Sequence, residues 1–287
     1  MYNFILVDDQ FAVRALWGIV LAAAIAIGAR RMRALTTGGA IAATTVGAIA
    51  IAAGWSWAVL LLAFFASSTM LSRWRHAEKE SRTAGVLAKD DERDAIQVLA
   101  NGAIFAAAAF LFKLHWLLTR ETLIDQDPTW TIGWMVLGAG ALSAACADTW
   151  STEVGTLAPG APRRITDRRE VPPGTSGGIT GAGLAAGACG ALFMALTVRI
   201  VHWPWSIAIA AGVGGIAGTL ADSFIGATVQ ARRRCPRCGV ATERWVHDCG
   251  ADTEEAGGIA WLDNDAVNAL CTGVGAIVAF VVWRLIA

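Results

Sequence analysis

Four carboxylates lie at the ends of apolar segments, which is an unusual place for charge. Asp148 and Glu153 lie at the end of one such segment, Asp222 lies near the end of another, and Asp265 opens a third, with no basic residue beside them in sequence. An uncompensated carboxylate in hydrocarbon costs about 2.5–3.5 kcal/mol on insertion scales. One such residue could simply cap a helix at the water boundary. For all four together we expect a Mg²⁺ site, because carboxylate oxygens suit a hard cation that shares its ligands with phosphate.

The neighbouring polar residues suggest how phosphate would be held. The stretch GTSGG (Gly174–Gly178) is expected to precede a helix, whose free N–H groups and dipole would bind an anion. A hinge or close helix packing would explain the same glycines, and no Gly-Lys-Ser/Thr follows, so the stretch is not a Walker A loop. The candidates for phosphate and nucleotide binding are Asn101, Arg163, Arg164, Gly174, Thr175, Ser176, Gly177, Gly178, Ser223, Asn264 and Asn268.

Cysteine spacing predicts a second metal. Within residues 230–258, Cys235, Cys238, His247 and Cys249 form a C-x2-C-x8-H-x-C pattern. A cytoplasmic loop keeps thiols reduced, so zinc is favoured over a disulfide. We expect a structural Zn²⁺ that holds this loop over the site, the alternative being a reduced, flexible loop.

The elements that must position these residues are transmembrane helices. The 287-residue chain is 55% hydrophobic and 16% charged, with a mean hydropathy of +0.52, whereas soluble domains carry about a quarter charged residues. Eight apolar stretches approach the roughly 20 residues that span a bilayer. We therefore predict an all-α, polytopic integral membrane protein of about eight helices, forming one domain over residues 1–287. The spans are Phe11–Ala29, Thr36–Ala53, Trp55–Leu71, Ala95–Trp116, Ile132–Thr149, Gly177–Val201, Trp205–Gln230 and Leu262–Ile286.

Charge in the connections predicts the orientation. Basic residues cluster after the first, third, fifth and seventh spans, for example Arg30–Arg33 and Arg232–Arg234. By the positive-inside rule these loops are cytoplasmic and both termini lie outside, which puts the carboxylates at the cytoplasmic face. The 13 tryptophans suit interfacial belts better than base stacking, so membrane lipids and not nucleic acid are the expected partners.

A weak internal sequence repeat suggests that the chain consists of two similar halves. TTGGAIAATTVGA (Thr36–Ala48) resembles TSGGITGAGLAAGACGA (Thr175–Ala191), and Asn101 and Asn268 occupy similar places in spans four and eight. This pattern predicts a parallel 4+4 helix repeat with the site between the halves. Gly/Ala bias alone would also produce it.

A series of motifs carries a resemblance to a known family. In order, QVLANG, ADTWSTEVG, PPGTSGG, ADSFIGATVQ, a Cys-rich loop and DNDAVN resemble the membrane family of the plant phytyl-phosphate kinase. The resemblance covers roughly Leu35 to the C-terminus. That family includes a human transmembrane protein and many archaeal and bacterial members, so a prokaryotic cell membrane is the expected location. It is distantly similar to dolichol kinase, phytol kinase and CDP-diacylglycerol synthase.

The resemblance implies phosphoryl transfer from a nucleoside triphosphate, with CTP the expected donor, to a prenyl monophosphate of phytyl or geranylgeranyl type. A CTP-dependent lipid cytidylyltransferase and a transporter or lipid carrier remain alternatives, and a homo-oligomer stays open. In the kinase reading Asp148, Glu153, Asp222 and Asp265 would hold Mg²⁺. The acceptor phosphate is already anionic, so positioning and electrostatics suffice without a strong base.

Overall fold

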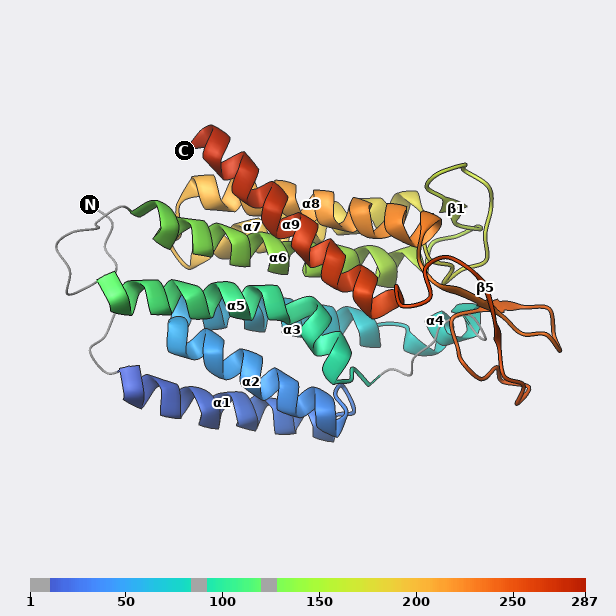
Figure 1. The fold of residues 1–287 in the computed structure, drawn as a ribbon, viewed down its shortest axis with the longest axis horizontal. Coiled ribbons are helices and arrows are strands. Elements are labelled where there is room, and N and C mark those ends of the chain that lie inside the picture. The colour runs from blue at the N-terminus through green and yellow to red at the C-terminus, as the bar shows by residue number, and fades with distance from the viewer. Residues whose placement is uncertain (1–10, 84–91, 120–127) are drawn as a thin grey trace.

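The computed structural model describes residues 11–83, 92–119 and 128–287, which form nine helices and five short strands (Figure 1). Seven helices are long and apolar enough to cross a membrane, and α2 is a shorter apolar helix of 17 residues. The predicted integral membrane protein of about eight spans is confirmed. The helices are α1 (Phe11–Arg31), α2 (Thr37–Ala53), α3 (Trp55–Arg73), α4 (His76–Thr83), α5 (Ala95–Thr119), α6 (Pro128–Gly155), α7 (Gly181–Ile200), α8 (Trp205–Thr228) and α9 (Asn264–Ile286).

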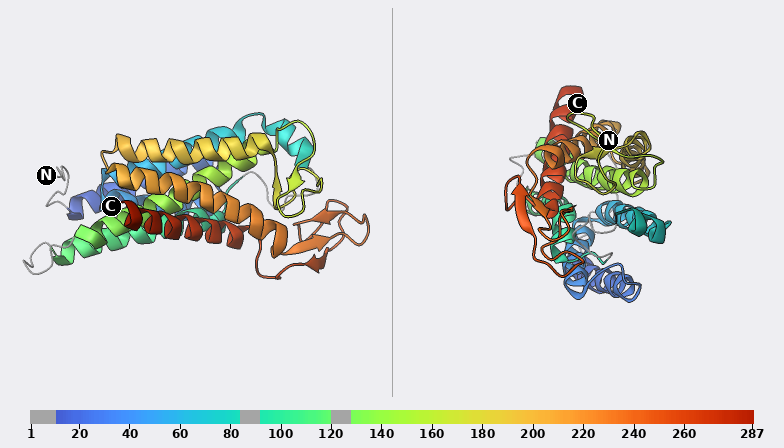
Figure 2. Two further views of the ribbon diagram at one scale, coloured as in Figure 1. Left: turned by 90° about the horizontal axis from the view of Figure 1, so that it is seen from above. Right: turned by 90° about the vertical axis from the view of Figure 1, so that its right-hand side faces the viewer.

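The strands and the polar helix α4 lie together at one end of the bundle (Figures 1 and 2). Strands β1 (Arg163–Arg164) and β2 (Gly178–Ile179) form one antiparallel pair, and β3 (Arg232–Arg234), β4 (Ala241–Thr242) and β5 (Glu254–Gly257) form a sheet of order β4-β3-β5. Helix α1 begins and α9 ends at the opposite end. All four basic connections therefore share one end, as expected; which end faces the cytoplasm stays a prediction.

Helix α6 is the centre of the bundle. It packs against α5, α7, α8 and α9, and 72% of its apolar window is buried, against 22% for α1 and for α3. Glycine permits the closest crossing: a methyl group at Gly218 of α8 would lie 2.4 Å from Cβ of Ala144 and 2.8 Å from the carbonyl oxygen of Cys271. Small residues thus bring the backbones of α6, α8 and α9 into direct contact.

The remaining helices attach through α5 and an aromatic cluster. Helix α2 packs on α1 and α5. Trp57 of α3 lies with its ring centroid 5.4 Å from Phe105, 5.4 Å from Phe112 and 5.1 Å from Trp203, and it is 1% exposed. Large apolar side chains elsewhere on the long helices are exposed, such as Ile41 (66%) and Leu285 (79%), as expected where a helix meets lipid.

Two of the boundaries that differ from the expected ones bear on the predicted site. Helix α7 begins at Gly181, because Gly178–Ile179 pairs as β2 and Thr180 caps the helix by accepting a hydrogen bond from the amide of Gly183 at 3.0 Å. GTSGG therefore does not open the helix. Helix α6 continues beyond the expected end at Thr149 to Gly155, so Glu153, like Asp148, lies inside the helix.

The predicted repeat stays a prediction, with one altered detail. Thr36 caps α2 through the amide of Gly39 at 3.0 Å, in the way that Thr180 caps α7. The sequence repeat aligned Thr36 with Thr175, whereas the residue with the same helix-capping role is Thr180.

Candidate active site

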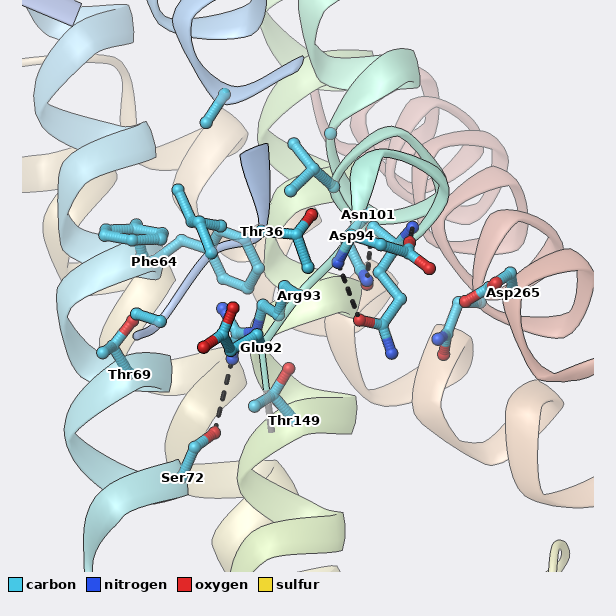
Figure 3. Close-up of a pocket in the computed structure, with 18 of the residues that line it drawn as sticks. Thr36, Phe64, Thr69, Ser72, Glu92, Arg93, Asp94, Asn101, Thr149 and Asp265 are labelled. Carbon is cyan, nitrogen blue, oxygen red and sulfur yellow. Dashed lines mark hydrogen bonds between the residues drawn. The ribbon is translucent and has the colours of Figure 1, made fainter. Parts of the chain in front are cut away.

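A cavity of about 1880 Å³ joins the strand-bearing end of the bundle to the apolar faces of α1, α2 and α3. Its polar end includes Asp148, Glu153, Asp222 and Asp265. Figure 3 shows part of this end, with Ser72, Arg93, Asn101 and Asp265 among the lining residues. One continuous cavity thus has a charged end, which carries both carboxylates and basic residues, and an apolar end.

Asp148 and Asp222 form the core of the polar end. One ligand-type atom each of Asp148, Asp222 and Cys271 lie within 4.8 Å of one another. Thr219 Oγ1 donates to Asp148 Oδ1 at 3.3 Å. Each aspartate lies four residues, about one turn, beyond a small residue of the helix crossing, Ala144 or Gly218, so the glycine contact places the two carboxylates face to face.

Glu243, just after β4, adds a carboxylate that sequence reasoning missed. Its Oε1 accepts hydrogen bonds from Ser176 Oγ and, at 3.0 Å, from Gln230 Nε2. Burial raises the pKa of Glu243 above its ordinary value; the Ser176 hydrogen bond opposes the rise, and the negative charges of Asp263 and Asp265 add to it. Several carboxylates therefore share one poorly solvated space, which a cation would stabilise.

Glu153 belongs to a different part of the cavity wall. Five residues separate it from Asp148, which places the two side chains about 140° apart around α6. Its Oε1 accepts from Ser72 Oγ at 2.5 Å, and Oε2 forms an ion pair with Lys79 of α4. Glu153 has no basic neighbour in sequence, but α4 brings Lys79 to it from 74 residues away.

Two basic residues line this wall. Lys79 Nζ also donates to the carbonyls of Leu71 at 2.7 Å and Ser72 at 2.6 Å, which fixes its position. Arg93 Nη2 donates to Ser72 Oγ at 3.4 Å, and the Arg93 carbonyl accepts from the Thr36 amide at 3.1 Å. Neither residue was among the site residues predicted from the sequence. The available signal was the position of Arg93 directly before an apolar span.

The predicted phosphate-binding residues divide into two groups. Asn101, Asn264 and Asn268 line the cavity with the four carboxylates, and Ser176 reaches its margin by contacting Glu243. The residues not found on the cavity wall are Arg163, Arg164, Gly174, Thr175, Gly177, Gly178 and Ser223.

Other contacts account for the second group. Arg163 pairs with Glu170 at 3.0 Å and Arg164 with Asp167 at 3.3 Å. Gly177 has φ +78°, and a Cβ there would lie 2.4 Å from the Ala227 amide nitrogen. Gly177 of GTSGG therefore allows close packing against α8, which is the packing alternative considered above.

The four predicted zinc ligands are also brought together. Ligand atoms of Cys235, Cys238, His247 and Cys249 lie within 4.8 Å of one another. This cluster is formed by the connections around β3, β4 and β5, and residues of the same sheet, including Arg233, Glu243 and Arg244, line or border the large cavity.

Comparison with known proteins places the chain in a family. Residues 20–276 match the model of the family described as "Integral membrane protein DUF92". The chain is 28% identical to Protein PGR of Arabidopsis thaliana over 89% of this chain and 91% of that protein. It is 30% identical to an uncharacterized membrane protein of Methanocaldococcus jannaschii over 94% and 95%. No solved structure matches significantly. The chain belongs to the DUF92 family of integral membrane proteins.

Proposed function

We propose that this protein is a membrane-embedded prenyl-phosphate kinase, which transfers a phosphoryl group from a nucleoside triphosphate to a prenyl monophosphate. One observation carries the proposal: a single cavity joins clustered carboxylates and basic residues, among them Lys79 and Arg93, to an apolar wall between helices. An amphiphilic substrate with a phosphate head and a hydrocarbon tail matches both ends. The volume of about 1880 Å³ exceeds the usual 300–1000 Å³ of a pocket for one small ligand, which supports two substrates.

The residues at the polar end fit Mg²⁺. Asp148 and Asp222 offer carboxylate oxygens from two rigid helices within 4.8 Å of one another and of Cys271, and Glu243 and Asp265 add oxygens nearby. Mg²⁺ prefers oxygen and is commonly held by one or two carboxylates together with substrate phosphates. Cys271 contributes a soft sulfur, so we assign it to packing. Bound Mg²⁺ would neutralise negative charge on the phosphates.

The chain's own residues would orient and neutralise the reactants. An oxygen of the prenyl monophosphate attacks the γ-phosphorus of the nucleotide, and the bond from that phosphorus to the β–γ bridging oxygen breaks, which releases the nucleoside diphosphate. The attacking oxygen is already anionic, so no strong base is needed. Arg93 lies on the cavity wall where it would hold phosphate oxygens, a task dominated by positioning and electrostatics. The three donors of Lys79 are taken by Leu71, Ser72 and Glu153, so Lys79 would fix the wall beside it.

The apolar wall supports a lipid acceptor. Ile25 of α1 and Val59 and Leu62 of α3 line the cavity and are 48%, 41% and 48% exposed. Hydrocarbon buried against such side chains gains about 25 cal/mol per Å². The tail would thus remain among the helices while the phosphate reaches the polar end.

The test is a turnover assay on the purified, detergent-solubilised protein. It contains Mg²⁺, each of the four nucleoside triphosphates in turn, CTP being the expected donor, and phytyl or geranylgeranyl monophosphate. We expect prenyl diphosphate and an equal amount of nucleoside diphosphate. Asp222→Asn, which keeps the side-chain size, should lose this activity, whereas Asp167→Asn in an exposed loop should keep it.

The other outcomes separate the alternative functions. Release of pyrophosphate with a nucleotide-linked lipid would identify a cytidylyltransferase. Uptake or exchange of lipid in proteoliposomes without nucleotide consumption would identify a carrier. Either result would overturn the kinase proposal.

A further inference from the structure

The sheet β4-β3-β5 has almost no apolar core of its own. Cys235 is fully buried, yet the large apolar side chains of this segment are exposed: Val240 is 41%, Trp245 70% and Val246 53% exposed. A segment of this size usually needs a disulfide or a metal to hold its fold. The six cysteines of the described residues are all free, which leaves a metal as the cross-link to consider.

The cysteine and histidine side chains have the arrangement of a tetrahedral metal site. Cys235 Sγ lies 3.5 Å from Cys249 Sγ, and His247 Nδ1 lies 3.3 Å from Cys249 Sγ. With Zn–S bonds of about 2.3 Å and Zn–N bonds of about 2.0 Å, tetrahedral ligands are expected about 3.5–3.8 Å apart. Three sulfurs and one imidazole are ligands typical of structural zinc.

The backbone is shaped around the same point. In the turn Cys235–Gly239, the amide of Cys238 donates to Cys235 Sγ at 3.4 Å, and Gly239 adopts φ +70°. A second turn ends at Gly250 with φ +78°, where the Gly250 amide donates to the His247 carbonyl at 2.8 Å. Each pair of ligands thus lies in a tight turn closed by a left-handed glycine. Amide donation to a cysteine sulfur is the kind of support that stabilises a metal-bound thiolate.

Arginines surround the cluster. Arg237 Nη1 donates to the Cys249 carbonyl at 3.2 Å, and Arg234 Nε donates to the Gly239 carbonyl at 3.0 Å. Three thiolates and one Zn²⁺ carry a net charge of −1, and nearby guanidinium groups would offset it. The charge pattern therefore favours the metal-bound state.

The sheet also carries residues into the large cavity. Gln230, which is separated from β3 by Ala231, hydrogen-bonds both Ser176 at 2.9 Å and Glu243 at 3.0 Å. Arg233 lies 3.8 Å from the centroid of the Trp245 ring and donates to Thr253 Oγ1 at 2.7 Å. Glu243, which follows β4 directly, is therefore carried to the cavity by the sheet and held there by Gln230 and Ser176.

We propose that Cys235, Cys238, His247 and Cys249 bind one Zn²⁺ that fixes the sheet β4-β3-β5 over the cavity and thereby positions Glu243. The metal is structural, since all four ligands come from the protein. Its loss would release the sheet while leaving the helices folded. Only the consequence for turnover rests on the proposed kinase activity.

The experiment measures zinc in the purified full chain by elemental mass spectrometry. We expect about one zinc per chain, as in a closed four-ligand site, and near none in Cys238→Ser or Cys249→Ser. Cys189→Ser, which changes an exposed cysteine on α7, is the matched control and should keep its zinc. A zinc-free wild type, or Cys238→Ser and Cys249→Ser variants that both retain zinc, would overturn the proposal.

Limited proteolysis then tests the structural role without any substrate. Trypsin should cleave after Arg234, Arg237 or Arg244 at least about tenfold faster when a strong chelator removes the metal, because local opening exposes the backbone, and added Zn²⁺ should restore protection. The wild type serves here, so a variant that fails to fold does not affect the result. Protection that persists in chelator, or a Cys235–Cys249 disulfide found by intact mass under reducing purification, would overturn the proposal. Glu243→Gln should retain zinc and protection but lose turnover.

Discussion

Replacing Gly218 by alanine tests whether the helix crossing sets the geometry of the acidic pair. The new Cβ would lie 2.4 Å from Cβ of Ala144 and 2.8 Å from the Cys271 carbonyl oxygen. Ordinary contact begins at about 3.4 Å, so α6 and α8 must separate by about 1 Å. Overpacking of this kind costs about 1–3 kcal/mol, and a displacement of about 1 Å near the reacting groups costs about 100-fold in rate.

The matched control is Gly212→Ala on the same helix, where the new Cβ would lie 3.5 Å from Cβ of Ala195. Thermal inactivation in detergent and the rate of prenyl diphosphate formation are measured for both variants. Gly218→Ala should lower the inactivation temperature and the rate, while Gly212→Ala should change neither by much. Equal behaviour of the two variants would refute the reasoning that the crossing positions Asp148 and Asp222.

Other predictions concern the individual side chains of the cavity. Asp222→Asn should reduce Mg²⁺-dependent turnover by about 10²–10³-fold, the range seen when one electrostatic contact to developing charge is removed; the same inactivation temperature for mutant and wild type would exclude misfolding. Lys79→Met should lower the free energy of unfolding by about 3 kcal/mol, because it leaves the partly buried Glu153 carboxylate without its ion-pair partner. The double variant with Glu153→Gln should recover much of that loss. Equal stability of the single and double variants would contradict a specific pair. Leu62→Trp should raise KM for a geranylgeranyl monophosphate far more than for a dimethylallyl monophosphate, because a larger side chain narrows the apolar wall; equal changes for both would show that the tail lies elsewhere.

The sequence predicted the helices and the acidic pair because both depend on local signals. Apolar length identifies a span, and a charge placed inside a span identifies a functional position. Asp148 and Asp222 met this criterion, and the structure places them together. The cysteine spacing was equally local, so its four ligands were found as a group.

The contacts that were missed join distant segments. Lys79 and Glu153 are 74 residues apart, and no periodic pattern links a polar connecting helix to the end of a transmembrane one. Glu243 is a single acidic residue in a loop rich in arginine and cysteine, so no sequence pattern marks it as a site residue. Its contact with Ser176 depends on the folded sheet. GTSGG was misplaced for the opposite reason: glycines that bind phosphate and glycines that allow close packing look alike in sequence, and only the Ala227 contact distinguishes them.

The unequal packing of the bundle separates the geometry of the carboxylates from the shape of the apolar wall. Helix α6 and its glycine contacts form a closely packed frame around the carboxylates, whereas fewer residues of α1 and α3 are buried. Changes in that wall reshape the space for a hydrocarbon chain without passing through the contact between Gly218 and Ala144. Under the proposed activity, substitutions in that wall would change the lipid tail that fits while the acidic centre keeps its geometry.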